Sequence, residues 1–251
     1  TGALLWTKEV GPFEGAPSEP VEVMEASGHG ASTVAVNGTQ VFAIFPNGDV
    51  AAFDFAGKLL WGSNLGLPEN HYGHSSSLLT HANLVYVQYD QNEGLSKLYA
   101  LDASTGKAVW TKDREHISWA SPILADTAAG LQLVLFSEVN LDAYDPVTGD
   151  LLWQVPVMGD MGPEVGASAA YRNGIVFAGN DGGAMAAVRL AGEAGSASAE
   201  MIWEYDEYLP DAASPVGDGE RFYLASAMGE IVAVDAEADE VVWAAYLGGG
   251  G

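Results

Sequence analysis

The chain has no cysteine among its 251 residues, which excludes disulfide bonds, thiolate metal sites and cysteine nucleophiles. Basic residues are scarce as well, because nine Lys and Arg stand against 34 Asp and Glu, for a formal net charge of −25 at pH 7. The electrostatic field of so negative a protein repels phosphate backbones and anionic lipid surfaces, so we expect no nucleic-acid partner. The acidity is typical of solubility in a saline or extracytoplasmic setting, or of a basic protein partner.

Long hydrophobic runs are also missing. No stretch approaches the roughly 18 uninterrupted apolar residues of a membrane-spanning helix, so we expect no membrane span in this chain. Nothing at Thr1 resembles a charged segment followed by an apolar run, and an export signal is therefore expected to lie outside this sequence. What the chain has instead is 31 Gly, 11 Pro and 48% hydrophobic residues in short runs that end at turns, a pattern that predicts strands rather than helices.

The short hydrophobic runs belong to a repeated sequence pattern. The stretch "ALDASTGKAVW" (residues 100–110) returns as "AYDPVTGDLLW" (residues 143–153), with the small residue, Asp, Thr-Gly and Trp at matching positions. Related segments close with a tryptophan along the whole chain, at Trp6, Trp61, Trp110, Trp153, Trp203 and Trp243. These six tryptophans delimit five complete units. A period of 40 to 50 residues is typical of propeller blades.

One unit shows how each repeat folds. "ASTVAV", "QVFAIF", "DVAAFDF" and "KLLWGSN" are four expected strands, and Asn37-Gly38 and Asn47-Gly48 between them favour two-residue hairpins. Each unit is thus a four-stranded antiparallel meander, with apolar residues on both faces of its first two strands. Apolar residues on both faces indicate that each sheet is covered on both sides by neighbouring sheets. This packing predicts an all-β fold, a β-propeller.

The repeated turn has a structural interpretation. Asp accepts backbone N–H bonds across the turn between the third and fourth strands, Gly takes a conformation closed to side chains, and Trp packs on the next sheet. We therefore expect Trp61, Trp110, Trp153 and Trp243 to be largely buried. The predicted docking residues are Asp54, Trp61, Asp102, Gly106, Trp110, Asp145, Gly149, Trp153, Asp235 and Trp243. The fourth unit has Arg189 in place of Asp and a Gly/Ser/Ala insertion, which predicts a long, mobile turn.

The Ala-x-Asp-x-x-Thr-Gly-Lys-x-x-Trp pattern resembles the tryptophan-docking motif of the pyrroloquinoline-quinone-like β-propellers. That family includes quinoprotein alcohol dehydrogenases, the propeller lipoprotein of the bacterial outer-membrane β-barrel assembly machine, and many exported proteins. The resemblance runs from about Ala3 to Trp243 and implies the fold more strongly than a function, because the motif docks blades and touches no substrate. Quinone-using members hold the quinone with a vicinal disulfide, which this chain cannot form, although some sugar-oxidising relatives lack it. No residue set here matches their calcium ligands.

The family's propellers usually close with seven or eight blades. We expect this chain to be a single β-propeller domain, residues 1–251, and part of such a ring. Residues 3–10 ("ALLWTKEV") are expected to be the last strand of a preceding blade. The five complete blades are expected at about residues 31–64, 75–113, 120–157, 167–206 and 213–246.

The segments that lead into each first strand, here called the leading loops, read "SGHGAS", "HYGHSSS", "HISWAS", "PEVGAS" and "LPDAAS". In a propeller they lie on one face around the channel, so their polar and aromatic residues are candidates for partner binding. These candidates are His29, His71, Tyr72, His74, His116, Trp119, Glu164, Tyr208 and Asp211. Two alternatives stay open: His71 and His74 with Glu164 or Asp211 form a metal or acid–base site, or these loop residues satisfy backbone groups.

The sequence therefore favours a non-enzymatic, exported propeller scaffold, periplasmic or extracellular, that binds a protein or peptide partner of basic character. Its parent protein is expected to be lipid-anchored or part of a complex. No catalytic residue, metal or cofactor is predicted, although the sequence alone leaves the question of enzymatic activity open. The alternative is a quinoprotein-type oxidoreductase that binds pyrroloquinoline quinone and calcium.

Overall fold

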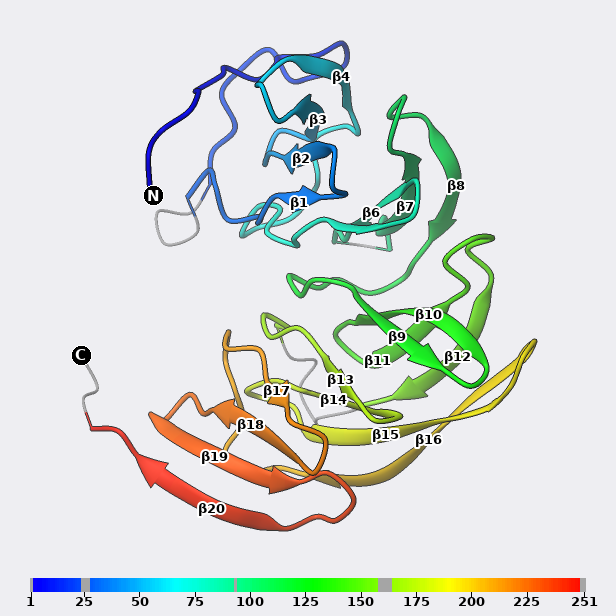
Figure 1. Cartoon of the computed structure of the whole chain (residues 1–251). Coiled ribbons are helices and arrows are strands. Elements are labelled where there is room, and N and C mark those ends of the chain that lie inside the picture. The colour runs from blue at the N-terminus through cyan, green and yellow to red at the C-terminus, as the bar shows by residue number, and fades with distance from the viewer. Residues whose placement is uncertain (1, 24–27, 93, 158–163, 249–251) are drawn as a thin grey trace. The chain divides into compact units, whose positions relative to one another are not determined.

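A computed structural model describes residues 2–23, 28–92, 94–157 and 164–248. Every regular element in these ranges is a β-strand, and the twenty strands form five separate four-stranded antiparallel sheets (Figure 1). The predicted all-β fold with four-stranded blades is confirmed. No helix in the described ranges has the length and apolar character needed to cross a membrane. The chain divides into two compact units, Thr1–Glu115 and His116–Gly251.

The first unit holds two sheets, each a meander in which neighbouring strands follow one another in the chain. The first sheet comprises β1 (Ala35–Val36), β2 (Gln40–Ile44), β3 (Asp49–Asp54) and β4 (Leu59–Asn64). The second comprises β5 (Leu79–His81), β6 (Leu84–Tyr89), β7 (Lys97–Asp102) and β8 (Ala108–Asp113). Phe42, Val50, Val87 and Leu101 belong to one hydrophobic cluster, which joins the facing sides of these two sheets.

The second unit holds three sheets of the same kind. The first comprises β9 (Ile123–Thr127), β10 (Gly130–Phe136), β11 (Asn140–Tyr144) and β12 (Leu151–Pro156). The second comprises β13 (Ala170–Arg172), β14 (Ile175–Gly179), β15 (Met185–Glu193) and β16 (Ser196–Tyr205). The third comprises β17 (Val216–Gly217), β18 (Arg221–Ala225), β19 (Glu230–Asp235) and β20 (Val241–Tyr246). One hydrophobic cluster joins the first and second of these sheets, and another joins the second and third. Strand β14 is buried along its whole length because it contributes to both of these clusters, one on each face of its sheet.

Each sheet repeats one feature of register. The tryptophan of the fourth strand pairs with an alanine of the third, as in Ala52↔Trp61 and Ala100↔Trp110, and a β-bulge follows that alanine in all five sheets. The small residue that opens the repeated motif is this alanine. A small side chain opposite the indole leaves the ring room on the sheet surface, and the bulge increases the local twist before the turn.

Residues 3–10 pair with none of the five sheets, and their assignment to the last strand of a preceding blade stays a prediction. The insertion of the fourth unit is not an irregular loop, since it lengthens β15 and β16 into one hairpin that stays in register as far as Glu193↔Ser196. That hairpin packs Ala197, Ala199 and Met201 on the core it shares with the β9–β12 sheet. The grouping of residues 1–251 into a single propeller domain stays a prediction.

Candidate functional site

The repeated turn between third and fourth strands is built by its aspartate. Asp102 Oδ1 accepts hydrogen bonds from the backbone N–H of Ser104 (3.0 Å) and Thr105 (2.9 Å) and from both their hydroxyl groups. These hydrogen bonds favour the carboxylate, so the pKa of Asp102 lies below its usual value. Asp54, Asp145 and Asp235 accept the same kind of backbone bonds two to four residues onward. Their geometry is that of turn residues.

Tryptophans of two successive repeats contact the following turn in the same way. The indole N–H of Trp6 donates to the carbonyl oxygen of Phe55 at 3.0 Å, and that of Trp61 donates to Ala103 at 2.8 Å. Both acceptors come directly after the turn aspartate. Each ring lies on the turn glycine, since a Cβ built on Gly57 or Gly106 would come within 2.8 or 2.5 Å of the indole. A side chain at either glycine would therefore displace the ring.

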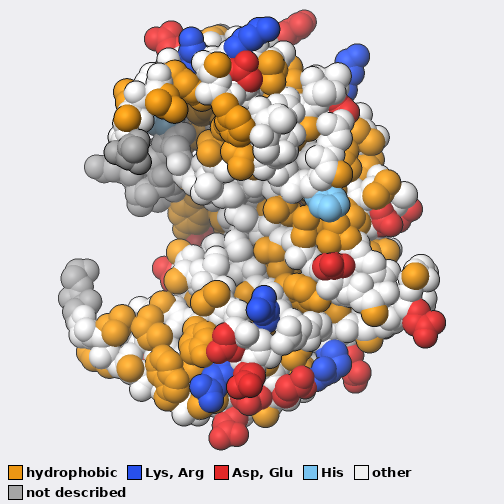
Figure 2. Space-filling model, viewed as in Figure 1, with side chains coloured by type: hydrophobic (Ala, Val, Ile, Leu, Met, Phe, Trp, Pro, Cys, Tyr) orange, Lys and Arg blue, Asp and Glu red, His pale blue; other side chains and the backbone are white. Residues whose placement is uncertain are grey.

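Trp153 departs from this contact, and the turn that follows it in the chain departs from the motif. Arg189, which replaces the turn aspartate, forms an ion pair with Glu237 of the next sheet's turn. The Trp153 indole N–H donates to Gln132 Oε1 at 2.6 Å, within its own sheet. Trp153 is buried and Trp110 half-buried, but Trp243 is 41% exposed. The prediction that Trp243 is largely buried is wrong, because no described sheet covers its face of β20; Figure 2 shows hydrophobic side chains exposed over this sheet.

The leading loops are joined by a repeated hydrogen bond between neighbouring sheets. The backbone N–H of Thr33 donates to Ser77 Oγ at 3.0 Å, that of Ser121 to Ser168 Oγ at 2.8 Å, and that of Ser168 to Ser214 Oγ at 2.9 Å. Each of these residues lies two positions before the first paired residue of its sheet, as Thr33 precedes Ala35. The first loop therefore aligns on Thr33, one residue later than its serine suggests. Each hydroxyl group accepts a hydrogen bond from a backbone N–H of the neighbouring leading loop.

His74 does not lie at the surface. It is 3% exposed, its ring centroid lies 5.2 Å from that of Tyr89, and burial lowers its pKa from 6.5 to about 4. The expectation of an accessible His74 is wrong because the loop is already extended here, so alternate residues (His74, Ser76, Leu78) point inward. His71 lies outside this run and is exposed, and its ring centroid lies 4.3 Å from that of Tyr72, with the two ring planes tilted by 49°.

In the second unit, backbone contacts connect the leading loops. Trp119 N–H donates to the Val165 carbonyl oxygen at 2.8 Å, and Asn180 holds the next loop through Gly166 N–H and the Glu164 carbonyl oxygen. The side chains of Glu164 and Asp211 are exposed. His116 Nδ1 lies 3.9 Å from Glu138 Oε2. Tyr208 lines a hollow of about 520 Å³ with Asp181, Asp206, Glu207, Leu209, Ala227, Met228 and Glu230.

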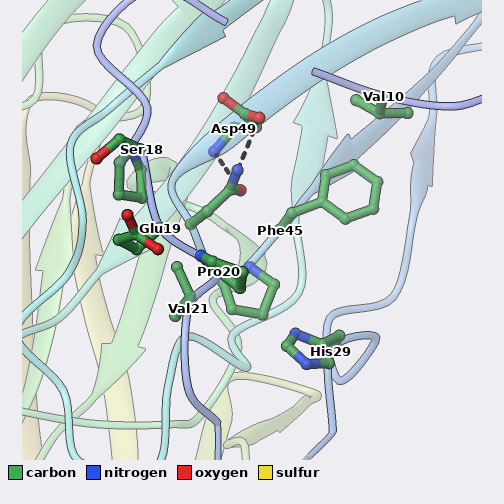
Figure 3. A pocket seen from close by; sticks show the side chains of 11 residues that line it. Val10, Ser18, Glu19, Pro20, Val21, His29, Phe45 and Asp49 are labelled. Atoms are coloured by element: carbon green, nitrogen blue, oxygen red, sulfur yellow. Dashed lines mark hydrogen bonds between the residues drawn. The ribbon is translucent and has the colours of Figure 1, made fainter. Parts of the chain in front are cut away.

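A second hollow lies on the first unit, and one predicted residue, His29, lines it. Its volume is about 390 Å³, and its walls are the arm of residues 10–21 and the turn between β2 and β3. Figure 3 shows Pro20 and Val21 between Glu19 and His29. The complete lining is Val10, Pro17, Ser18, Glu19, Pro20, Val21, His29, Phe45, Pro46, Asn47 and Asp49.

Asp49 connects the arm to the sheet beneath it. This carboxylate is 1% exposed and accepts hydrogen bonds from Asn47 Nδ2 and Asn64 Nδ2, both at 2.8 Å, and from Phe13 N–H at 3.3 Å (Figure 3 shows the first of these). The Phe13 ring fills the space above Gly62, where a Cβ would approach it to 2.0 Å. The carboxylate is held by internal donors, so its role is to position the arm.

Sequence reasoning missed a buried ion pair near the second leading loop. Arg114 Nη1 lies 2.5 and 2.7 Å from the two carboxylate oxygens of Asp90, and both side chains are almost fully buried. Gln88 Nε2 donates to the same carboxylate at 2.7 Å. Asp90 directly follows the end of β6, and Arg114 directly follows the end of β8. Opposite charges at the ends of two strands of one sheet were the sequence signal that could have indicated this ion pair. Across the described ranges no three His, Asp or Glu side chains gather as a metal site would require.

Consecutive four-stranded antiparallel sheets that share hydrophobic clusters within each unit place the chain in the class of β-propellers with PQQ-like repeats. Residues 1–245 match the family described as outer membrane protein assembly factor BamB, and the chain belongs to that family.

A curated relative and two solved structures show how far the similarity extends. Outer membrane protein assembly factor BamB of Moranella endobia (strain PCIT) is 30% identical over 125 residues, which are 49% of this chain and 28% of that protein. The crystal structure of BamB from Moraxella catarrhalis has a TM-score of 0.64 at 18% identity, covering 86% of this chain and 63% of the other. Quinohemoprotein alcohol dehydrogenase ADHIIG from Pseudomonas putida HK5 has a TM-score of 0.59, also at 18% identity, over 86% and 42%. The chain thus spans less than two thirds of each of these proteins, and the structural similarities establish the fold alone.

Proposed function

We propose that the protein is a non-enzymatic scaffold of the periplasm that binds a protein partner through its leading loops during outer-membrane protein assembly. The observation that carries this proposal is the family match over residues 1–245. The proposed partner-binding side chains are the accessible members of the predicted set. They are His29, His71, Tyr72, His116, Trp119, Glu164, Tyr208 and Asp211.

The geometry of the loops supports a binding role. The serine hydrogen bonds between neighbouring sheets and the Asn180 contacts fix the loop backbones, so the exposed side chains are presented on a rigid frame. A rigid frame lowers the entropy cost of binding a partner. The net charge of −25 and the hollow beside Tyr208, with four carboxylate residues in its lining, support a partner of basic character.

Site-specific cross-linking tests the proposal. A photoreactive p-benzoylphenylalanine is placed at the position of Trp119 or Asp211 in the full-length protein in its native cell envelope. Matched controls carry it at exposed positions of the outer strands, Leu59 in β4 and Val109 in β8. Cross-links to the same envelope protein from both loop positions, and none from the controls, are expected. Equal cross-linking from all four positions would place the partner elsewhere.

The oxidoreductase alternative has its own test. The purified full-length protein is incubated with pyrroloquinoline quinone and Ca²⁺, and thermal stability and dye reduction are measured with alcohol and sugar substrates. No saturable stabilisation and no turnover are expected. Saturable stabilisation together with turnover would overturn the non-enzymatic assignment.

A further inference from the structure

The hollow on the first unit is held open from both sides. Its arm is fixed at Phe13, whose ring packs over Gly62 and whose backbone N–H donates a hydrogen bond to Asp49. The chain before the arm is fixed at Trp6, whose indole N–H donates to the carbonyl oxygen of Phe55. The opposite wall is the turn between β2 and β3, closed by a hydrogen bond from Gly48 N–H to the Phe45 carbonyl oxygen at 2.9 Å. Since both walls are tied to the same sheet, the hollow exists before a ligand arrives, which lowers the entropy cost of filling it.

Six of its eleven lining residues are apolar. Prolines 17, 20 and 46 contribute rings and no backbone N–H groups, and Val10, Val21 and Phe45 complete the apolar surface. Rings of proline and phenylalanine favour another flat apolar group over a strongly hydrated one. A volume of about 390 Å³ lies at the lower end of the range for ligand pockets, which suits one or two side chains rather than a folded surface.

The segment that lines the hollow carries Asp and Glu but no Lys or Arg. Between Lys8 and Lys58 the sequence has no Lys or Arg, whereas it has seven Asp and Glu. Of the two acids in the lining, Asp49 is buried and bonded internally, while Glu19 is exposed at the rim. A cation held beside an occupant of the hollow would therefore meet Glu19 without any competing basic side chain of this segment.

We propose that this hollow binds a linear peptide segment of the partner, with an aromatic or proline side chain in the apolar interior and a neighbouring Lys or Arg paired with Glu19. The inference rests on the proposed scaffold function and assigns it a site and a partner chemistry. His29, from the first leading loop, lines the same hollow, which connects this site to the predicted binding surface.

Peptide titration of the ¹⁵N-labelled chain, followed by NMR, tests the site. The probe is acetyl-Gly-Phe-Pro-Lys-Gly-amide; one counterpart replaces its Lys by Glu, and the other replaces both its Phe and its Pro by Gly. Saturable shifts at the amides of Ser18, His29 and Phe45 are expected with the probe. Affinity should fall at least about tenfold with the Glu peptide and be undetectable with the Gly peptide. Equal affinity for all three peptides would overturn the proposal.

A matched pair of charge reversals on the arm separates a specific contact from the general field. Glu19 lines the hollow and Glu22 does not, although both are exposed on the same segment. Glu19→Lys should weaken the probe at least about tenfold, whereas Glu22→Lys should change its affinity less than about twofold. Equal losses in both variants would reduce the interaction to the net charge and overturn the assignment of Glu19.

The two proposals fail in different ways. Loop cross-links in the envelope without probe binding would remove the hollow as the recognition site and leave the scaffold function standing. Probe binding at the hollow without any envelope cross-link would overturn the scaffold function and leave a peptide site on the first unit.

Discussion

The indole N–H of Trp61 donates a 2.8 Å hydrogen bond to the carbonyl oxygen of Ala103, 42 residues further along the chain, and thereby joins the first sheet to the turn of the second. The same ring lies on Gly106. A single side chain thus supplies both apolar contact and a directional bond between two blades, which explains why the sequence repeats the Trp and the turn together.

Trp61→Ala should destabilise the protein by about 2 to 4 kcal/mol, because it removes a large side chain from the sheet junction and leaves the Ala103 carbonyl without its donor. Trp243→Ala is the matched control, since Trp243 has the same position in the last sheet and is 41% exposed. We expect its cost to be below about 1 kcal/mol. Chemical denaturation measures both values, and equal losses would argue against the docking role.

Gly106→Ala should also be destabilising, for two separable reasons. Gly106 has φ +71°, and an added methyl group would approach the Trp61 ring to 2.5 Å. Gly94 has the same φ with no atom within 4 Å of its Cβ position, so Gly94→Ala measures the backbone strain alone, about 1 to 2 kcal/mol. The contact with Trp61 should add about 1 to 3 kcal/mol in Gly106→Ala. The two variants would lose equal stability only if the ring did not occupy this place.

His74 should make stability dependent on pH. Burial lowers its pKa from 6.5 to about 4, so between these values the unfolded chain binds a proton that the folded chain does not. The stability contributed by the neutral ring is complete above pH 6.5 and is lost as the pH falls to about 4, by about 3 kcal/mol in all. Unfolding curves of the wild type and of His74→Phe between pH 4 and 7.5 measure it. The difference between them should shrink on acidification, and a constant difference would contradict a buried neutral histidine.

Asp90→Asn should cost about 3 to 5 kcal/mol, because it leaves the Arg114 guanidinium buried without its carboxylate. Lys97–Asp113 is a control in the same sheet, with a 2.6 Å contact between exposed side chains. Asp113→Asn should therefore cost less than about 1 kcal/mol. Thermal and urea unfolding compare the two variants, and similar values would mean that solvent reaches Asp90.

The repeats indicated the fold because the requirements of a docked blade are local. A turn aspartate, a glycine with positive φ and a tryptophan opposite an alanine act within about eleven residues, so they remain visible in sequence. These local features predicted the four-stranded sheets. The hydrogen bonds of the turn aspartates were predictable for the same reason, because each carboxylate bonds residues only two to four positions onward; these aspartates are Asp54, Asp102, Asp145 and Asp235. Two-residue turns between the first and second strands, as between Arg172 and Ile175, made the pairing of these strands predictable for the same reason.

What the tertiary structure decided was the exposure of individual side chains. The burial of His74 depends on the point at which its loop becomes extended, and the exposure of Trp243 depends on whether another sheet covers its own. The pairing of Asp90 with Arg114, and the hollow between the arm and the β2–β3 turn, join residues separated by 24 or more positions. Periodicity gives the direction of a side chain relative to its own strand, but only the packing of one sheet or arm against another determines what that side chain meets.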